Sequence, residues 1–246
     1  MRLTVFGSGD AFSGCGCNAA YGVDGSVLVD CGAPVPALSQ RAAFNLRSMR
    51  LILVTHFHAD HTFMLPIVLG AVAVAAEDEP PDLIIAGPAG IREYALRLVG
   101  DGYGTQMQEL IQQRVSPRFV TLQDGSDEQL QGYRVRAHSV VHSLGPSLAY
   151  SMTDAEGATV GFSGDSTLCP GVHRAIAGCD LFVCECTGWD GPVPGGHMWR
   201  DEVASLVAAY PATTFLLSHL AERRTLPGAL IAHDLLALDV VQAASA

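Results

Sequence analysis

Residues 51–62, LILVTHFHADHT, join an uninterrupted apolar run to a cluster of metal-binding side chains. The run LILV is typical of a strand that is buried on both faces of a sheet. Side chains two positions apart in an extended segment point the same way, so His56 and His58 can bind one metal ion. Asp60 and His61 lie at the start of the helix expected next and face a second position. Packing alone gives little reason for four such residues within six positions, so this feature predicts a metal site at a strand end.

Three later strands are each expected to end in a further metal-binding side chain. His142 follows the apolar strand in SVVHS, Asp165 follows GFSG, and His219 follows TFLLS. Imidazole and carboxylate together suit Zn²⁺, with Fe²⁺ and Mn²⁺ as alternatives. The seven ligands exceed what one tetrahedral ion can use, and a bridging carboxylate would let two ions share one hydroxide. The sequence therefore predicts two divalent metal ions.

The rest of the chain alternates apolar strand patterns with helical ones and contains neither an internal repeat nor a low-complexity linker. This organisation predicts one domain over residues 1–246. The expected strands cover residues 3–7, 18–23, 26–32, 51–56, 82–87, 118–122, 133–142, 147–154, 158–165, 179–185 and 213–219, and the expected helices cover 36–47, 60–75, 90–100, a short segment after Asp165, 200–209 and 227–238. Because each sheet needs a cover on both faces, a sandwich of sheets with outer helices is the natural solution.

These motifs resemble the metallo-β-lactamase superfamily. Its signature HxHxDH is present in THFHADHT, and the later His, Asp and His stand in the family order. The opening GSGDAFSGCGCNAAYGV, followed by VLVDCG, is similar to the ribonuclease Z branch, which includes tRNA 3′-processing enzymes and small phosphodiesterases. The resemblance covers essentially the whole chain. It implies an α/β protein with an αββα sandwich, in which two mixed β-sheets are flanked by helices.

The resemblance also implies a role for individual residues. It assigns metal 1 to His56, His58 and His142, metal 2 to Asp60, His61 and His219, and a bridging position to Asp165. Asp60 would orient the attacking hydroxide. Two further residues match the branch, Glu185 in FVCECT and His197 in PGGHMW. A Glu that fixes the tautomer of a His makes a competent proton donor, whereas Glu185 alone could equally be a capping or loop carboxylate.

Composition restricts the partners. The formal net charge is −11 and all 14 basic residues are arginines, so the chain repels large nucleic acids at long range. The longest apolar run, 63–76, is too short to span a bilayer. The N-terminus has no stretch of signal-peptide length, so we expect a cytoplasmic protein without a membrane partner. The seven cysteines are then reduced, and the pairs CGC and CEC, which lack the C-x₂-C spacing of zinc sites, are interpreted as structural.

Other polar features predict less chemistry. The segment GSGDAF lacks the Lys and the helix of a phosphate-binding loop, so no organic cofactor is expected. We interpret His138 as structural, and we expect His173 and His233 to be exposed on helices. The segments near 101–117 and 188–198 are expected to be loops that determine specificity.

The sequence therefore predicts a dinuclear metal-dependent hydrolase that cleaves a phosphodiester in a small molecule or nucleotide. The first alternative is a hydrolase of a lactone, thioester or other carboxylic ester on the same fold. A tRNA 3′-processing role is disfavoured, because such enzymes insert a long arm between the third His and the bridging Asp, and here only 22 residues separate His142 from Asp165. A non-enzymatic accessory protein would have little reason to keep seven ligands. The sequence leaves open whether the protein forms a homodimer.

Overall fold

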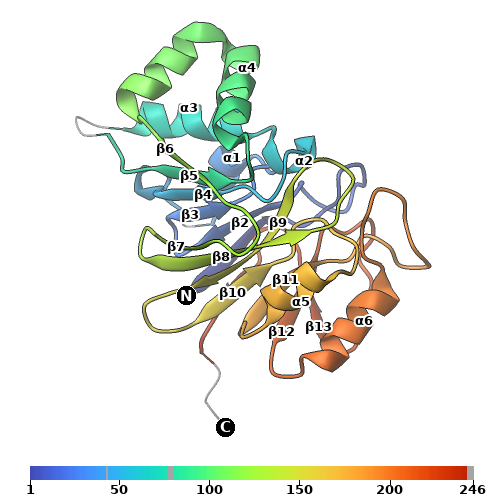
Figure 1. The fold of residues 1–246 in the computed structure, drawn as a ribbon. Coiled ribbons are helices and arrows are strands. Elements are labelled where there is room, and N and C mark those ends of the chain that lie inside the picture. The colour runs from blue at the N-terminus through green and yellow to red at the C-terminus, as the bar shows by residue number, and fades with distance from the viewer. Residues whose placement is uncertain (43, 77–79, 243–246) are drawn as a thin grey trace.

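Two β-sheets are stacked between two sets of helices (Figure 1). The computed structural model describes residues 1–42, 44–76 and 80–242. The first sheet contains, in spatial order, β14 (Ala237–Asp239), β1 (Arg2–Gly7), β2 (Ala20–Val23), β3 (Val27–Val29), β4 (Leu51–Leu53), β5 (Ile84–Gly87) and β6 (Arg118–Thr121). The second contains β13 (Ala229–Ile231), β12 (Thr214–Ser218), β11 (Leu181–Glu185), β10 (Thr159–Phe162), β9 (Ser147–Thr153), β8 (Tyr133–Val140) and β7 (Asp127–Leu130).

Helices cover the outer face of each sheet (Figure 1). The helices on the side of the first sheet are α1 (Val35–Ser39), α3 (Leu65–Ala75) and α4 (Ile91–Arg114), and those on the side of the second are α5 (Pro170–Ile176) and α6 (Arg200–Ala209). The short helices α2 (Ala59–Thr62) and η1 (Leu46–Ser48) complete the described elements. The αββα sandwich expected from the sequence is thus confirmed.

Three apolar layers stabilise this arrangement. Strand β4 contributes side chains to two of these layers. Leu51 and Leu53 belong to the core between the sheets, whereas Ile52 and Val54 pack in the core beneath α3 and α4. Alternate side chains of a strand point to opposite faces, so an uninterrupted apolar run fills both layers. The expectation that this strand is buried on both faces is confirmed.

Parallel strands bring distant parts of the chain to one edge of the sandwich. Strands β10, β11 and β12 are parallel neighbours, as are β3, β4 and β5. The carboxyl ends of parallel strands meet at the same edge, so the residues that follow them are brought close together. Each predicted ligand comes shortly after such a strand end or, for His142, after the antiparallel strand β8.

The prediction of a closing helix at 227–238 is wrong. This segment forms β13, which pairs with β12, and β14, which pairs with β1. These pairings satisfy the outer backbone groups of β12 and β1 and make the short strands β13 and β14 the edges of the two sheets. Between the two strands, Asp234 accepts hydrogen bonds from the backbone N–H groups of Ser8 (3.2 Å) and Cys17 (2.8 Å), which a helix would not allow. His233 is exposed as expected but lies outside any helix.

The expected loop at 101–117 is also wrong over most of its length, because α4 continues to Arg114. Its glycines suggested a break, yet only Gly104 (φ 76°) departs from helical geometry, and it produces a kink. Beyond the kink, Ile111 is buried, and Met107 and Leu110 pack against the same core. Tertiary packing therefore outweighs the low helix propensity of glycine.

Two other expected helices are interrupted. Helix 60–75 divides into α2 and α3, because Pro66 fits only the first turn of a new helix. Helix 36–47 is reduced to α1 and η1. Phe44 turns inward against Phe6, with ring centroids 5.1 Å apart, and Asn45 caps η1 by accepting from the N–H of Arg47. Residue 43 lies outside the described residues.

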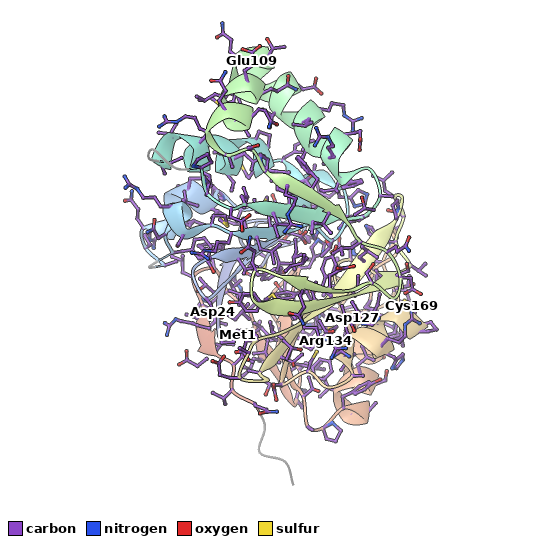
Figure 2. All side chains as sticks on the ribbon, turned by 60° about the vertical axis from the view of Figure 1, so that its left-hand side comes forward. Met1, Asp24, Glu109, Asp127, Arg134 and Cys169 are labelled. Carbon is purple, nitrogen blue, oxygen red and sulfur yellow. The ribbon has the colours of Figure 1, made fainter. Side chains whose placement is uncertain are left out.

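Side chains pack closely through the sandwich, and charged groups gather on its surface (Figure 2). Asp127 and Arg134 form one such surface pair, 2.6 Å apart, on β7 and β8. The apolar run 63–76 forms α3, which is buried along Leu65, Val68 and Leu69. Within the described residues, no helix is both long enough and apolar enough to cross a membrane.

Candidate metal centre

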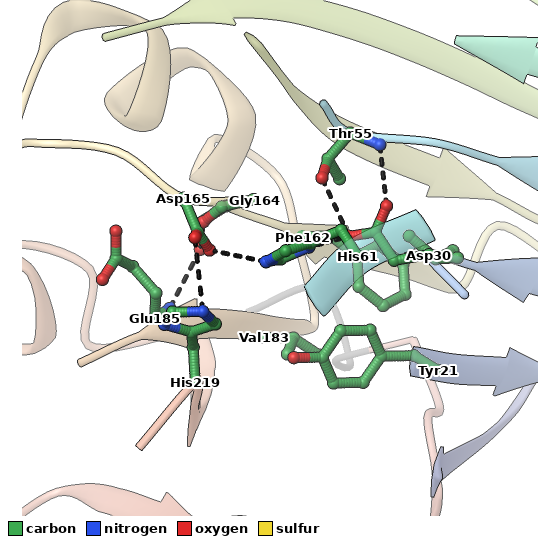
Figure 3. A pocket seen from close by; sticks show the side chains of 12 residues that line it. Tyr21, Asp30, Thr55, His61, Phe162, Gly164, Asp165, Val183, Glu185 and His219 are labelled. Carbon is green, nitrogen blue, oxygen red and sulfur yellow. Dashed lines mark hydrogen bonds and ion pairs between the residues drawn. The ribbon is translucent and has the colours of Figure 1, made fainter. Parts of the chain in front are cut away.

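The seven predicted ligands converge at the edge where the strand ends meet. They form two groups, in each of which the candidate ligand atoms lie within 4.8 Å of one another. The first group contains His56, His58, His142 and Asp165, and the second contains Asp60, His61, Asp165 and His219. Asp165 is common to both and lies between His61 and His219 in Figure 3. The fold thus places one carboxylate where it can bridge two cations.

A relay of hydrogen bonds orients His56. Thr55 donates its hydroxyl proton to Asp30 Oδ2 (2.8 Å), so the same hydroxyl accepts a hydrogen bond from His56 Nδ1 (3.0 Å). Asp30 also accepts from His61 Nδ1 (2.7 Å) and from the backbone N–H of Thr55 (2.8 Å). Both rings therefore carry a proton on Nδ1 and present Nε2 to the site, as Figure 3 shows for His61. Such partners fix the tautomer and raise the basicity of a metal-binding histidine.

A matching relay orients His219. Thr187 donates to Glu185 Oε2 (2.8 Å) and accepts from His219 Nδ1 (2.9 Å). His142 is fixed differently, since its Nδ1 donates to the carbonyl oxygen of Gly196 (3.0 Å). Its Nε2 then lies 2.9 Å from His58 Nδ1, and both nitrogens face the first group. The metal-facing nitrogen of each of these histidines is thereby defined by a neighbouring acceptor.

Two buried nitrogens give a direct test of whether a metal fits. Nε2 of His56 and Nε2 of His61 are buried without a hydrogen-bond partner in the described residues. An unsatisfied buried polar atom is costly, and such atoms in native proteins call for an explanation. A divalent cation at each group would take up these lone pairs. The residues present therefore fit metal ions.

The electrostatics of the two groups also favour cations. Burial lowers the pKa of His56, His58 and His142, so these rings are neutral ligands at neutral pH. Burial alone would also lower the pKa of His61 and His219, but Asp165 together with Asp30 at His61, and Asp165 together with Asp60 at His219, outweigh it and raise both. The negative potential that holds these protons also attracts a metal ion, which would displace them.

The carboxylates are ionised. Burial acts to raise the pKa of Asp165, but His219 and His61 bring it well below its ordinary value. Burial has the same tendency at Asp60, where the hydrogen bond with His219 (3.1 Å) and the charge of His61 lower the pKa to about 2. Two permanent negative charges therefore face the second group.

Glu185 and His197 form a pair beside the ligand groups. Both carboxylate oxygens of Glu185 lie 3.2 Å from His197 Nδ1, and Oε1 also accepts from the backbone N–H of Ser166 (2.6 Å). Burial raises the pKa of Glu185, while the hydrogen bond with His197 opposes the shift. Burial would lower the pKa of His197, but Glu185 raises it above its ordinary value. The pair therefore holds a proton on a ring that points to the same cavity as the ligands.

A cavity of about 590 Å³ opens over these residues. Its lining includes His58, Asp60, Asp165, His197 and His219. The segment 193–195 contributes to one side, so the expectation that the stretch near 188–198 helps form the substrate site agrees with its position. The segment 101–117 does not line this cavity within the described residues.

The other histidines and the cysteines are not among the proposed ligands. His138 is half-buried in β8, and His173 is exposed on α5, where its Nδ1 lies 2.9 Å from the hydroxyl of Tyr210. All seven cysteines lie in the described part of the chain and are free thiols. Cys184 and Cys186 are buried, and Cys15 and Cys17 are half-buried.

Sequence reasoning missed the residues that hold the ligands. Asp30, Thr55 and Thr187 carry the two relays; they stand in the segments VLVDCG, THFHADHT and FVCECT, but no role was predicted for them. The sequence did contain a feature that could have identified Asp30 as part of the site. Asp30 follows the apolar strand VLV, just as the predicted ligands follow their strands. Asp30 also adopts a left-handed conformation (φ 58°), which is uncommon for a residue other than glycine.

Replacing Asp30 by asparagine should weaken metal binding by about 10–100-fold, the usual effect of losing a partner that orients a ligand. The amide keeps the shape, but its nitrogen cannot accept hydrogen bonds. Competition with a chelator measures the affinity, and circular dichroism verifies folding. Asp127→Asn, on the surface, is the matched control. If Asp30→Asn left the metal affinity unchanged, Asp30 would only stabilise the loop and would not orient the ligands.

A two-sheet sandwich with paired His/Asp groups at the strand ends defines a class of metal-dependent hydrolases. The family model described as "Beta-lactamase superfamily domain" matches residues 26–220, and the chain belongs to this superfamily, in its ribonuclease Z-like branch. Ribonuclease Z of Methanosarcina acetivorans is 25% identical over 253 residues, an alignment that covers 81% of this chain and 79% of that protein.

Two solved structures show the same fold. The short form of human tRNase Z superimposes with a TM-score of 0.78 and 21% identity, covering 98% of this chain and 100% of that one. A diphosphatase from the PhnP family superimposes with a TM-score of 0.71 and 18% identity, covering 98% of each chain. Together with the His/Asp groups, the family supports a metal-dependent hydrolase that binds divalent metal.

Proposed function

We propose that residues 1–246 form one hydrolase domain, a dinuclear phosphodiesterase that acts on a small-molecule or nucleotide diester. The observation that carries the proposal is the Glu185–His197 pair, whose His197 ring lines the same cavity as the two ligand groups joined by Asp165. The names of the relatives support phosphorus chemistry, since they are called ribonuclease Z, tRNase Z and diphosphatase.

The residues that would hold the metals are those of the two groups. His56, His58 and His142 would bind one ion, Asp60, His61 and His219 the other, and Asp165 both. Zn²⁺ suits this mixture of imidazole and carboxylate best, with Mn²⁺ and Fe²⁺ as alternatives. When bound, such ions lower the pKa of water toward neutrality and neutralise charge on phosphoryl oxygens.

The protein residues have separate tasks in the reaction. A water molecule that has released one proton to the solvent forms a bond to phosphorus through its oxygen, the bond to the leaving oxygen breaks, and that oxygen gains a proton from the protein, which the solvent later replaces. A carboxylate with a pKa of about 2 is a poor base at neutral pH, so Asp60 orients the water instead of accepting its proton. His197, held by Glu185, supplies the proton to the leaving oxygen.

Hydrolysis of a lactone, thioester or other carboxylic ester is the principal alternative. The protein would need the same metals, but the pair formed by the buried Glu185 and the partly exposed His197 favours a leaving group that requires a proton. A thioester has less need of it, because a thiolate leaves at much lower pH than an alkoxide. The pair therefore disfavours a thioester, whereas a lactone or simple ester also releases an alkoxide, and against these the names of the relatives favour the phosphodiester.

A tRNA-processing role is less well supported. Most of the chain between His142 and Asp165 forms strands β9 and β10, with a tight turn between them, and leaves no room for a long arm. The net charge of −11 also opposes binding of a large polyanion. A non-enzymatic role would leave the convergence of seven ligands without a purpose.

A panel assay of the purified protein, with its metal content measured, tests the proposal. The panel contains bis-(p-nitrophenyl) phosphate, cyclic nucleotides, a lactone and a pre-tRNA. We expect turnover of the diesters and little of the lactone or the pre-tRNA. Preferred cleavage of the lactone would assign the protein to carboxylic esters instead.

Metal analysis should give about two ions per chain, because seven ligands exceed the need of one tetrahedral ion. His142→Ala removes a ligand of the first group only and should lower the content toward one. His173→Ala, an exposed histidine on α5, should leave it at two. One tightly bound ion in the unmodified protein, unaffected by His142→Ala, would contradict the dinuclear model.

A further inference from the structure

The cavity above the ligand groups is lined by two kinds of surface. One part consists of the ligands and His197. The remainder contains an apolar part, made of Ala11, Phe12, Ala59, Val193, Pro194 and Ala221, together with Gly195 and the polar residues Asp10, Ser143 and Thr187. Phe12 stands out, because its side chain is 100% exposed although it lines the cavity. An aromatic ring left entirely in water at the mouth of a reaction site has its whole face available to a ligand.

The loop that carries Phe12 is fixed on both sides. Oδ1 of Asp10 accepts from the N–H groups of Ser13 (2.7 Å) and Phe12 (3.3 Å), and Asn18 donates to the Asp10 carbonyl (2.8 Å). The N–H of Asp10 donates to the carbonyl of Leu220 (3.2 Å), directly after the ligand His219. The loop is thus tied to the metal edge. A ring held on a preorganised loop loses little entropy when it binds a partner.

The charge of the lining limits what else can bind. The sequence contains no Lys, and none of the described residues that line the cavity is an Arg. Recognition of a second phosphate relies on such cations. Beyond the scissile phosphate, the cavity therefore suits an uncharged and largely apolar group.

We infer that Phe12 determines specificity by stacking on an aromatic group attached to the scissile phosphodiester. The inference rests on the proposed function and narrows its substrate class to diesters that carry a flat ring, a nucleobase included. Stacking against an aromatic side chain tolerates different rings, because each offers a π-face. The polar part of the cavity then holds the phosphate, while the apolar part holds the ring.

Two diesters of similar size and leaving group test the inference. Dibenzyl phosphate carries aromatic rings, and bis(cyclohexylmethyl) phosphate carries saturated ones. With the metal-loaded protein, ³¹P NMR of the monoester formed gives kcat/KM for each. Phe12→Ala should lose about tenfold on the dibenzyl ester, the scale of an aromatic pair plus its buried area, and clearly less on the saturated ester.

One further variant separates stacking from apolar contact, and a second serves as the control. Phe12→Leu keeps an apolar side chain but has no π-face, so it should lose about fivefold on the dibenzyl ester and almost nothing on the saturated one. Tyr103→Ala removes an exposed aromatic ring from α4, outside this cavity, and should change neither. Equal losses on both esters in Phe12→Leu would overturn the inference.

Calorimetric titration with phenylphosphonate and cyclohexylphosphonate tests the stacking without turnover. The metal-loaded protein should bind the phenyl compound more tightly, and Phe12→Ala should abolish the preference. If neither diester is hydrolysed, the proposed function fails, and this titration still decides the role of Phe12. No preference for the phenyl compound overturns the inference. So does a dimer, seen by sedimentation, that dissociates in Phe12→Ala, because Phe12 would then bind a second copy of the chain.

Discussion

Asp60→Ala should lower kcat on a phosphodiester by about 10²–10⁴-fold, because it removes a metal ligand together with the group that positions the water, while the fold remains intact. Asp60 lies at the second ligand group, 3.1 Å from His219 Nε2 and 3.5 Å from His61 Nε2. The substitution removes one ligand and the group proposed to orient the water. The first group keeps three histidines and Asp165, so one ion should remain bound.

The position of Asp60 explains why the fold should tolerate its loss. Its side chain is half-buried and faces the cavity, and it is bonded to the ligand set instead of the core. Steady-state kinetics, metal analysis and circular dichroism on the same preparation separate the effects. Asp127→Ala, which removes a surface carboxylate, is the matched control. If Asp60→Ala kept more than about a tenth of the activity, Asp60 would have no part in the reaction, since positioned groups contribute far more.

His197→Ala should slow the cleavage of a poor leaving group much more than that of a good one. A ribose alkoxide needs a proton as it leaves, whereas p-nitrophenolate is already stable near neutral pH. Thymidylyl-thymidine and the p-nitrophenyl ester of thymidine 5′-phosphate share one nucleoside and differ in this respect. We expect the variant to lose about 10²-fold more rate on the dinucleotide, the usual scale of general acid catalysis. Metal content should stay near that of the unmodified protein, because His197 is not among the seven proposed ligands.

Two companion variants sharpen this result. Glu185→Gln should show the same pattern more weakly, because Glu185 acts on the reaction through the orientation and pKa of His197. Metal analysis of this variant checks the relay through Thr187 to His219, in which Glu185 also takes part. His173→Ala, remote from the cavity, should affect neither substrate. Equal losses on both substrates in His197→Ala would mean that His197 binds substrate. Loss of metal in that variant would mean that it supports the ligands.

The candidate site was predictable from the sequence to the extent that its residues are local. His56, His58, Asp60 and His61 stand within one short segment, and their arrangement follows from the geometry of a strand end and a helix start. The later ligands could be identified because each follows an apolar strand. Asp30 and Thr187 were missed because their function depends on partners far along the chain, at His61 and His219.

The errors in the fold have the same origin. The helix expected at 227–238 has an apolar pattern that suits either a helix or short strands, and the free edges beside β12 and β1 decided the outcome. The continuation of α4 beyond Gly104 depended on the core that receives Ile111. In both places the local sequence was ambiguous, and contacts with distant segments determined the structure.

By itself, the sequence determined the kinds of ligand, the strands that precede them and the apolar pattern that builds two covered sheets. These properties depend on the chemistry of single residues and on periodicities of two and 3.6, which neighbours in the chain define. The family resemblance implied that Asp165 bridges, and the tertiary structure brings its carboxylate into both groups. Only the tertiary structure decided that threonine relays fix His56 and His219 and that Phe12 stands at the mouth of the cavity. These relations join residues separated by up to about two hundred positions, and they arise only when parallel strands bring their carboxyl ends to one edge.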